Sequence, residues 1–376
     1  MENTMSKKQT PFRYDIVGSF LRPAKLKEAR KQFEEGQLDA KGLKQVEDEA
    51  ITDLIEKIKA AGYHTLTDGE FRRATWHLDF MWACDGIAHK PTKTGLPFHG
   101  EQAMIDDTYL VGKIALTNEH PFVEHFRFIQ SFEDENTVAK QTIPAPAQFL
   151  AQFIMPFNDA ETKKYYSDRN ALIDDIVAVY QKTIDQLYEA GCRNLQLDDC
   201  TWGMLVDETA PSFFNTDVEG LKAYQILFKD INNAVIDYAP KDFVINTHIC
   251  RGNYHSAYAG KGAYDAVADV VFGKENANAY FLEYDDARSG SFAPLAKLTG
   301  EKKVVLGLVT TKNPQLEDKD EVIRRIREAE NFVPLERLYL SPQCGFASCE
   351  IGNKLTEEEQ WAKLKLVKDI AEEVWG

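Results

Sequence analysis

The chain has 376 residues, of which 44% are hydrophobic and 28% charged, a composition typical of globular proteins that bury a large core. Asp and Glu number 60 against 44 Lys and Arg, and the net charge of −16 argues against nucleic acid and anionic membranes as partners. No run approaches the roughly 18 apolar residues of a membrane span. The first 15 residues lack the apolar core of a signal peptide, so we expect a short disordered lead-in to a cytoplasmic protein.

Short apolar segments alternate with amphipathic segments along the whole chain. Helical spacing of apolar residues predicts helices over 47–62, 170–191, 318–332 and 356–375, the last with Thr356 as N-cap. The segments rich in β-formers predict strands at 15–20, 64–70, 138–146, 194–200, 243–250, 280–286, 303–312 and 337–345.

Eight strands, most of them followed by a helix, predict one (β/α)8 barrel domain spanning residues 1–376. A doubly wound open sheet is the alternative. Residues 71–140 are too many for one connection between strands two and three. We expect them to form an inserted subdomain or hairpin over the barrel mouth.

The six cysteines are too few for a disulfide framework in a chain of this length, so reduced thiols are expected. Cys84 and Cys192 are interpreted as small buried hydrophobic residues, and Cys349 as structural. Cysteines at strand ends are candidates for thiolate chemistry instead.

The predicted strands end in polar residues, and in a (β/α)8 barrel these ends meet at one mouth, where active sites lie. His248 and Cys250 share one face of their strand, and Cys344 ends a distant strand. An imidazole and two thiolates suit a tetrahedral zinc ion with one position left for a substrate. Glu283, which follows three apolar strand residues, is a candidate fourth ligand. The pattern leaves open a histidine and cysteines that only fill the core.

Six short motifs, in order, resemble those of the cobalamin-independent methionine synthase family. They are "VGSF" at 17–20, "TDGE" at 67–70, "LQLDD" at 195–199, "HIC" at 248–250, "EYDDARSG" at 283–290 and "PQCG" at 342–345. The resemblance spans nearly the whole chain and matches the catalytic C-terminal barrel of the long enzymes, without their N-terminal barrel.

The resemblance implies a zinc site made of His248, Cys250, Glu283 and Cys344. It also implies a homocysteine site made of the loop Val17, Gly18 and Ser19 and the carboxylates of Glu70 and Asp198. Carboxylates suit an α-ammonium, and backbone N–H groups and hydroxyls suit an α-carboxylate. The implied reaction moves a methyl group to the homocysteine thiol, which zinc activates by removing its proton.

The match departs from the family at the methyl donor. Lys312, in "TTKNP", stands where the long enzymes carry a histidine that protonates methyltetrahydrofolate, and "DDC" at 198–200 replaces their D-E-P. Lys312 and Asp198 are the predicted catalytic residues. The alternative for Lys312 is that it only binds solvent or an anionic tail. The donor is methyltetrahydrofolate or a different compound, such as a methylcorrinoid or a small methylated molecule.

Arg72 and Trp202 are further candidates for binding the donor, the first for a glutamate tail and the second for a flat ring. Aromatic residues in such a stripe are also common in cores and interfaces. Besides methyl transfer to homocysteine, the residues leave open another thiol acceptor, a zinc hydrolase on a barrel, and a protein that binds zinc without catalysis. Two cysteine ligands count against the hydrolase.

Overall fold

The computed structural model describes residues 9–376, so the first eight residues of the expected lead-in lie outside the described part. Beyond them the chain is packed against the barrel. Thr10 is buried, and its N and Oγ1 donate hydrogen bonds to Asn194 Oδ1 at 2.9 and 3.2 Å. The expectation of a disordered lead-in is therefore wrong for residues 9–15, which cover the amino-terminal ends of the strands.

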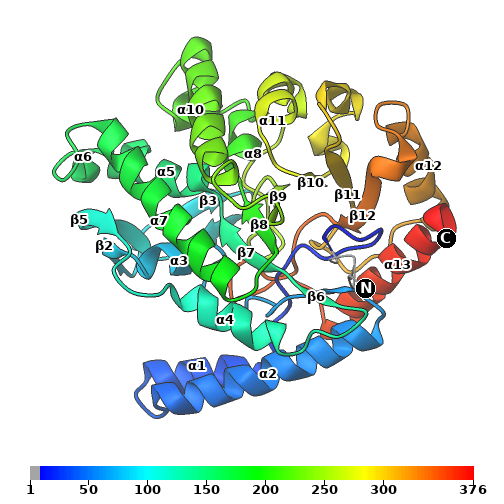
Figure 1. Ribbon diagram of the computed structural model, residues 1–376, viewed down its shortest axis with the longest axis horizontal. Helices are drawn as coiled ribbons and strands as arrows, with labels where there is room; N and C mark the ends of the chain where they lie inside the picture. Colours follow the sequence, from blue (N-terminus) through cyan, green and yellow to red (C-terminus); the bar gives the residue numbers. More distant parts are fainter. Residues whose placement is uncertain (1–8) are drawn as a thin grey trace, which may run out of the picture.

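Parallel strands at the centre of the molecule follow one another in chain order (Figure 1). Sequential order is the arrangement of a TIM barrel, whereas a doubly wound sheet reverses its strand order at a switch point. The fold is thus of the TIM-barrel type. The six strands of the main sheet in the described part of the chain are β7 (Gln141–Pro144), β8 (Asn194–Asp198), β9 (Val244–Ile249), β10 (Ala279–Glu283), β11 (Lys303–Val309) and β12 (Leu338–Pro342).

Beside this sheet, β1 (Thr65–Leu66) pairs in parallel with β6 (Val138–Ala139), which continues into β7 after Lys140. The first segment predicted as a strand, residues 15–20, is irregular. It begins beside β12, where Asp15 N donates to Leu340 O at 3.0 Å, and ends beside β1, where Phe20 N donates to Gly69 O at 3.0 Å. It therefore lies between the two outer strands without a continuous ladder to either.

The four predicted helices are confirmed as α2 (Ala40–Ala60), α7 (Arg169–Glu189), α12 (Lys319–Ala329) and α13 (Glu357–Trp375). Thr356 caps α13 in a capping box with Glu359. Helices surround the strands, and α2 lies with α1 along one side (Figure 1). The other helices are α1 (Ala24–Glu34), α3 (Leu78–Trp82), α4 (Pro121–Gln130), α5 (Pro146–Ile154), α6 (Pro156–Thr162), α8 (Thr201–Leu205), α9 (Ala210–Phe213), α10 (Val218–Ile236) and α11 (Ala268–Lys274). Short 3-10 turns occupy Tyr264–Ala266, Ala287–Ser289, Ala293–Lys297 and Leu335–Arg337.

The long connection between β1 and β6 carries two antiparallel strand pairs as well as α3 and α4. One pair is β2 (Asp85–Lys90) with β5 (Asp107–Ala115), and the other is the hairpin β3 (Leu96–Phe98) with β4 (Glu101–Ala103). The hairpin contacts the loop after β9, where His99 N donates to Tyr258 O at 2.9 Å. The division into one domain with an insertion at 71–140 stays a prediction.

A buried lysine ties the irregular first segment to the sheet. Lys140 Nζ donates to Ile16 O at 2.5 Å and to Gln196 Oε1 at 2.9 Å, and it lies 3.9 Å from Asp15 Oδ1. Both charged side chains are fully buried, so each needs the other as a counter-ion. Lys140 thus links residues 15–16 to β8 through the interior.

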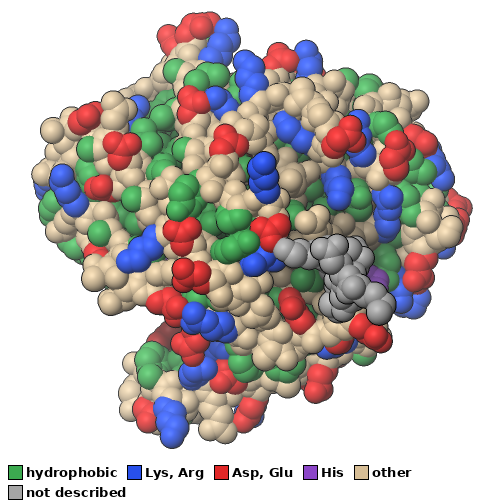
Figure 2. Space-filling model, in the orientation of Figure 1, with side chains coloured by type: hydrophobic (Ala, Val, Ile, Leu, Met, Phe, Trp, Pro, Cys, Tyr) green, Lys and Arg blue, Asp and Glu red, His purple; other side chains and the backbone are tan. Residues whose placement is uncertain are grey.

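Acidic and basic side chains are interspersed on the face of the molecule seen in Figure 2, including the part formed by α1 and α2. Within residues 9–376, helices with enough length and apolar character to cross a bilayer are absent.

Candidate active site

Three side chains at the carboxyl ends of two strands form a possible metal site. His248 lies near the end of β9, Cys250 directly follows that strand, and Cys344 follows β12. Their ligand atoms all lie within 4.8 Å of one another, and all three side chains are buried. His248 Nδ1 lies 3.3 Å from the carbonyl oxygen of Phe281, which fixes the ring and leaves Nε2 without a partner. The cluster has the ligand types and spacing to hold one metal ion.

Glu283, the expected fourth ligand, lies at the end of β10 outside this three-residue cluster. Its Oε2 accepts a hydrogen bond from Arg251 N at 3.0 Å, and its Oε1 lies 3.2 Å from the Arg288 guanidinium. Burial raises the pKa of Glu283, but the nearby cations, Lys312 first among them, lower it overall. The carboxylate is therefore ionised and already partnered, and its role as a ligand stays a prediction.

Lys312 lies close to the same carboxylate. Its Nζ is buried and makes no hydrogen bond to the described residues. Burial lowers the pKa of Lys312, but Glu283 and Asp285 outweigh burial and raise it above its usual value. Lys312 thus carries a positive charge at neutral pH and is a weaker acid than an ordinary lysine.

Two carboxylates meet on the other side of the mouth. Glu70 follows β1, and Asp198 ends β8 in register with His248 of β9. Burial raises the pKa of Glu70 to about 7, and that of Asp198 to about 7 as well. Glu70 Oε2 has no hydrogen-bond partner in the described structure. Two buried carboxylates that lack full compensation form a site for a cationic group.

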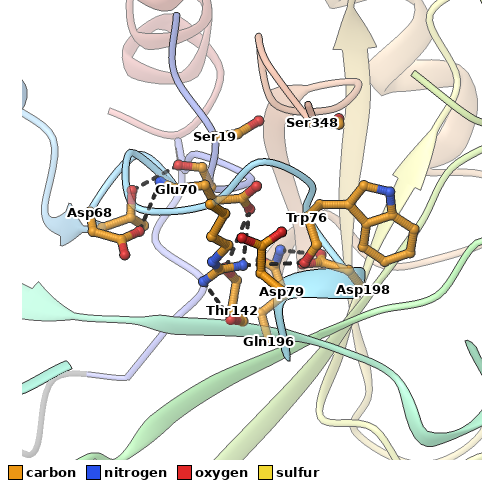
Figure 3. Close-up of polar contacts among 12 residues, drawn as sticks. Ser19, Asp68, Glu70, Trp76, Asp79, Thr142, Gln196, Asp198 and Ser348 are labelled. Carbon is orange, nitrogen blue, oxygen red and sulfur yellow. Dashed lines mark hydrogen bonds and ion pairs between the residues drawn. The ribbon is translucent and has the colours of Figure 1, made fainter. Parts of the chain in front are cut away.

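Figure 3 shows how these side chains lie relative to one another. Asp198 accepts a hydrogen bond from Gln196 Nε2 at 2.8 Å, and Thr142 Oγ1 lies 3.4 Å from Glu70 Oε1. Ser19 and Ser348 are seen on the side of Glu70 opposite to Thr142 (Figure 3). The close-up therefore shows carboxylates on one side and two hydroxyl groups on the other.

The loop Val17, Gly18 and Ser19 lies beside the carboxylate of Glu70. Gln196 Nε2 donates to Val17 O at 2.9 Å, and Thr67 Oγ1 donates to Gly18 O at 2.8 Å. A Cβ on Gly18 would lie 3.1 Å from Thr142 Cγ2 and 3.3 Å from Glu70 Oε1. Glycine therefore lets this backbone approach the carboxylate closely.

The structure does not bring Arg72 into the site. Its guanidinium pairs with Glu47 at 3.1 Å and Asp48 at 2.5 Å, both on α2. The neighbouring Arg73 faces the site instead. It lies 3.6 Å from Glu70 Oε1, and its Nη2 donates to Thr142 O at 2.8 Å. Glu70, two positions before Arg72, has a φ of +61°. This left-handed conformation turns the chain that follows, which explains why Arg73 rather than Arg72 faces the site.

Trp202 is fully buried on α8 and does not line the cavity beside the metal cluster. Trp76 lines this cavity and stacks on His77, with ring centroids 4.4 Å apart. The cavity has a volume of about 420 Å³, and Cys200, Asn253 and the β3–β4 hairpin also line it. The aromatic residues around position 76 indicated this part of the cavity wall in the sequence. No pattern in the sequence indicated that the β3–β4 hairpin would also line the cavity.

The chain resembles known proteins over nearly its whole length. Residues 13–373 match the family model described as "Cobalamin-independent synthase, Catalytic domain". The chain belongs to this family of methyltransferases. It is 41% identical over 378 residues to the protein YxjG of Bacillus subtilis (strain 168), covering 100% of this chain and 97% of that protein.

Two solved structures share the family fold. A putative vitamin-B12 independent methionine synthase from Listeria monocytogenes has 36% identity and a TM-score of 0.76, with 98% of this chain and 99% of that chain covered. A B12-independent methionine synthase from Shewanella sp. W3-18-1, in complex with selenomethionine, has 19% identity and a TM-score of 0.72, with coverages of 96% and 97%. The family resemblance and the fold class expected from the sequence are both confirmed.

Proposed function

We propose that this methyltransferase transfers a methyl group from methyltetrahydrofolate, or a related donor, to the thiol of homocysteine, with zinc as its metal. One observation carries the proposal. Asp198 and His248 are register partners on adjacent strands, so the carboxylate pair and the metal cluster share one mouth. An amino acid bound by its ammonium at the carboxylates has its side chain directed along the same mouth, where a thiol would meet the metal.

The donor set supports zinc. One imidazole nitrogen and two thiolate sulfurs suit a tetrahedral zinc site with an exchangeable position, and oxygen-preferring ions such as Mg²⁺ do not favour them. The Nε2 of His248 is an imidazole nitrogen, a ligand type that zinc binds. When bound, zinc would hold the homocysteine sulfur as a thiolate at neutral pH.

The acceptor site rests on charge complementarity. Glu70 and Asp198 have raised pKa values because they are buried, and a bound α-ammonium would stabilise both in their ionised form. The α-carboxylate would lie toward the hydroxyl groups of Ser19 and Ser348, on the side of Glu70 away from Thr142. Selenomethionine in the Shewanella protein is an amino acid of the same general shape, which agrees with this assignment.

In the transfer step, the homocysteine sulfur forms a bond to the methyl carbon while the bond between that carbon and the donor breaks. The leaving nitrogen of a folate donor takes up one proton, equivalent to the proton that the homocysteine thiol gives up. Lys312 and Asp198 stay the predicted catalytic residues. The raised pKa of Lys312 favours an electrostatic role, because the charges of Glu283 and Asp285 hold its ammonium in the protonated form. Asp198 would orient the acceptor through its ammonium.

A second candidate differs in the methyl donor, a methylcorrinoid or a small methylated compound. The charges around the 420 Å³ cavity favour it. Among the described residues, Lys261 is the one lysine or arginine that lines this cavity. Its ammonium lies 3.0 Å from the Glu208 carboxylate, and Asp207 adds a negative charge. A polyglutamate tail carries several carboxylates and would need cations that are not already neutralised.

The test is an assay with zinc-loaded protein, homocysteine and a panel of donors, scored for methionine. The panel contains methyltetrahydrofolate with one and three glutamates, a methylcorrinoid and small methylated sulfonium or ammonium compounds. Methionine from at least one donor supports the proposal, and no methionine from any of them contradicts it. Glu283→Gln, assayed for zinc content, tests the predicted fourth ligand separately.

A further inference from the structure

The cavity beside the metal cluster has aromatic walls. The rings that line it come from the connection between β1 and β6, from α6 and α9, and from the loop after β9; they belong to Trp76, Phe98, Phe157, Phe213, Phe214 and Tyr254. Phe98 and Tyr254 contact each other with ring centroids 5.7 Å apart, and Phe213 and Phe214 with centroids 5.2 Å apart. An enclosure of aromatic rings attracts cations that carry methyl groups, because the faces of the rings are electron-rich.

A buried carboxylate adds a negative charge to these walls. Asp207 Oδ1 accepts hydrogen bonds from Thr209 N at 2.8 Å and Thr209 Oγ1 at 2.6 Å, and Asp207 Oδ2 accepts one from Lys261 N at 2.7 Å. Burial raises the pKa of Asp207, but these hydrogen bonds outweigh burial and lower it below its usual value. The ammonium of Lys261 pairs with Glu208 instead. The charge of Asp207 is therefore held by neutral donors and is available to a cationic ligand.

A neutral imidazole faces the same cavity. His77 lines the cavity and is 6% exposed, and its Nδ1 has no hydrogen-bond partner among the described residues. Burial lowers the pKa of His77 to about 3, so the ring is uncharged at neutral pH. A neutral imidazole carries a lone pair on one nitrogen and does not repel a cation. The buried part of the lining thus combines aromatic rings, one carboxylate and one neutral imidazole.

The cavity extends to the metal cluster. Cys200 lines the cavity, and its sulfur lies 3.2 Å from the sulfur of Cys250. Gly252 and Asn253, which follow Cys250 in the chain, line the cavity as well. A methyl group on a molecule in the cavity therefore lies close to a sulfur held at the cluster. The volume of about 420 Å³ is toward the lower end of the roughly 300–1,000 Å³ of ligand pockets, which suits a small donor.

We propose that this cavity binds a small methylsulfonium cation and that this cation is the methyl donor. The inference rests on the proposed transfer to the homocysteine thiol and names the class of its donor. The acceptor sulfur forms a bond to the methyl carbon, and the bond between that carbon and the donor sulfur breaks. The electron pair of the broken bond stays on the donor sulfur, which leaves as a neutral thioether.

This step needs no acid beside the donor. A folate nitrogen must take up a proton as it leaves, whereas a sulfonium becomes neutral by losing its methyl group. The proton of the acceptor thiol is released to water when the thiol binds as a thiolate. His77, which is uncharged, is therefore suited to a donor of this kind, and its role is to bind the cation and not to protonate it.

Calorimetry on zinc-loaded protein tests the binding site without turnover. The probe is the dimethylsulfonium derivative of propanol, compared with the neutral isostere in which CH replaces S⁺. We expect the sulfonium to bind about tenfold more tightly than the isostere. Equal affinities of the two compounds for the wild type would overturn the inference.

Two variants locate the selectivity for charge. Asp207→Asn and Trp76→Leu should each remove most of it, and the affinity of Asp207→Asn for the neutral isostere shows whether the cavity is intact. Asp85→Asn is the matched control, because Asp85 accepts hydrogen bonds from Thr117 N and Oγ1 in the same way but lies on β2. Full selectivity in both cavity variants would contradict the assignment of the cation to these walls.

Turnover with homocysteine separates this inference from the proposed function. The sulfonium should yield methionine and the neutral thioether in equal amounts, and Asp207→Asn should raise KM for the sulfonium more than it lowers kcat. Methionine from methyltetrahydrofolate but not from the sulfonium would overturn the inference and leave the proposed function intact. Selective binding of the sulfonium without methionine from any donor would contradict the proposed function and leave the cation site standing.

Discussion

Gly345 and Ser19 approach each other so closely that a Cβ on Gly345 would lie 1.9 Å from Ser19 Oγ and 2.9 Å from Ser19 N. Phe346 N donates to Ser19 O at 2.9 Å in the same place. Gly345 directly follows the metal-cluster residue Cys344, and Ser19 belongs to the loop proposed to bind the acceptor. The contact therefore couples the two halves of the site.

Gly345→Ala should push the Ser19 loop away and weaken methionine binding, with a loss of stability of about 1–3 kcal/mol from overpacking. Isothermal titration with methionine and urea unfolding measure the two effects. Gly273→Ala is the control, because the nearest atom to its new Cβ would be 3.8 Å away. It should leave methionine binding unchanged and should raise stability by up to about 1 kcal/mol, because alanine favours a helix over glycine. Ser19→Gly combined with Gly345→Ala should recover part of the stability. Simple additivity of the two single variants would contradict the steric explanation.

Cys344→Ser should lose zinc while leaving the barrel folded, because a serine hydroxyl is a poor ligand for zinc and Cys344 lies after the strand rather than within it. Metal content after dialysis gives the affinity, and far-UV circular dichroism gives the fold. Cys192→Ala is the control, because Cys192 lies in the hydrophobic core and does not belong to the metal cluster. Full zinc occupancy in Cys344→Ser would mean that the ligand set is wrong.

Stability should fall as the pH rises from about 4.5 to 7, because burial raises the pKa of Glu70 from 4.5 to about 7. In that window the folded protein holds a proton that the unfolded chain has released. Rising pH therefore lowers the free energy of the unfolded state relative to the folded state. The effect of one such group is on the order of 3 kcal/mol. Urea unfolding at pH 5 and pH 8 measures it.

Glu70→Gln should remove much of this pH dependence and should be more stable than the wild type at pH 8. The same substitution should weaken methionine binding, because one partner of the α-ammonium is lost. In the wild type, methionine affinity should rise with pH through 7 as the carboxylates ionise. An unchanged slope of stability against pH in Glu70→Gln would exclude this carboxylate as the cause.

Lys140→Met should destabilise the fold by about 3–5 kcal/mol, because it leaves the buried Asp15 without its counter-ion. Urea unfolding detects the loss. The double variant Lys140→Met and Asp15→Asn should recover part of it, since the uncompensated charge is gone. A loss below about 1 kcal/mol in the single variant would show that the pair contributes little to holding residues 15–16.

Arg72 and Arg73 should differ in what their removal affects. Arg72→Ala breaks the ion pairs to Glu47 and Asp48 on α2 and should lower stability without changing methionine affinity. Arg73→Met removes the cation 3.6 Å from Glu70 and should change methionine affinity and its pH dependence. Calorimetry on both variants compares them directly. Equal effects on methionine affinity would contradict the assignment of Arg73 to the site.

The strand ends and the metal cluster were predictable from the sequence because they depend on local patterns. Apolar runs such as 243–250 end in residues whose chemistry is visible in the sequence, and the barrel brings all such ends to one mouth. His248, Cys250 and Cys344 lie together for this reason. To predict that these three residues lie close together, only the correct fold class was needed. The periodicity of the strands and helices indicated that fold class.

The choice between neighbouring residues was not predictable in the same way. Whether Arg72 or Arg73 faces the site depends on the positive φ of Glu70. The two adjacent arginines do not by themselves reveal that backbone turn. The contact between Cys200 and Cys250, whose sulfur atoms are 3.2 Å apart, depends on how the chain turns from β8 into α8. The irregular path of residues 15–20 depends on contacts with β12 and β1, which are distant in the chain.

The hairpin β3–β4 pairs within itself and joins none of the barrel strands in the described structure, although it lines the cavity next to the metal cluster. Its sequence can therefore change without disturbing a strand that carries a ligand or a carboxylate. Exchange of residues 96–103 for those of another protein should therefore reshape the cavity wall while leaving the strands that carry His248 and Asp198 unchanged.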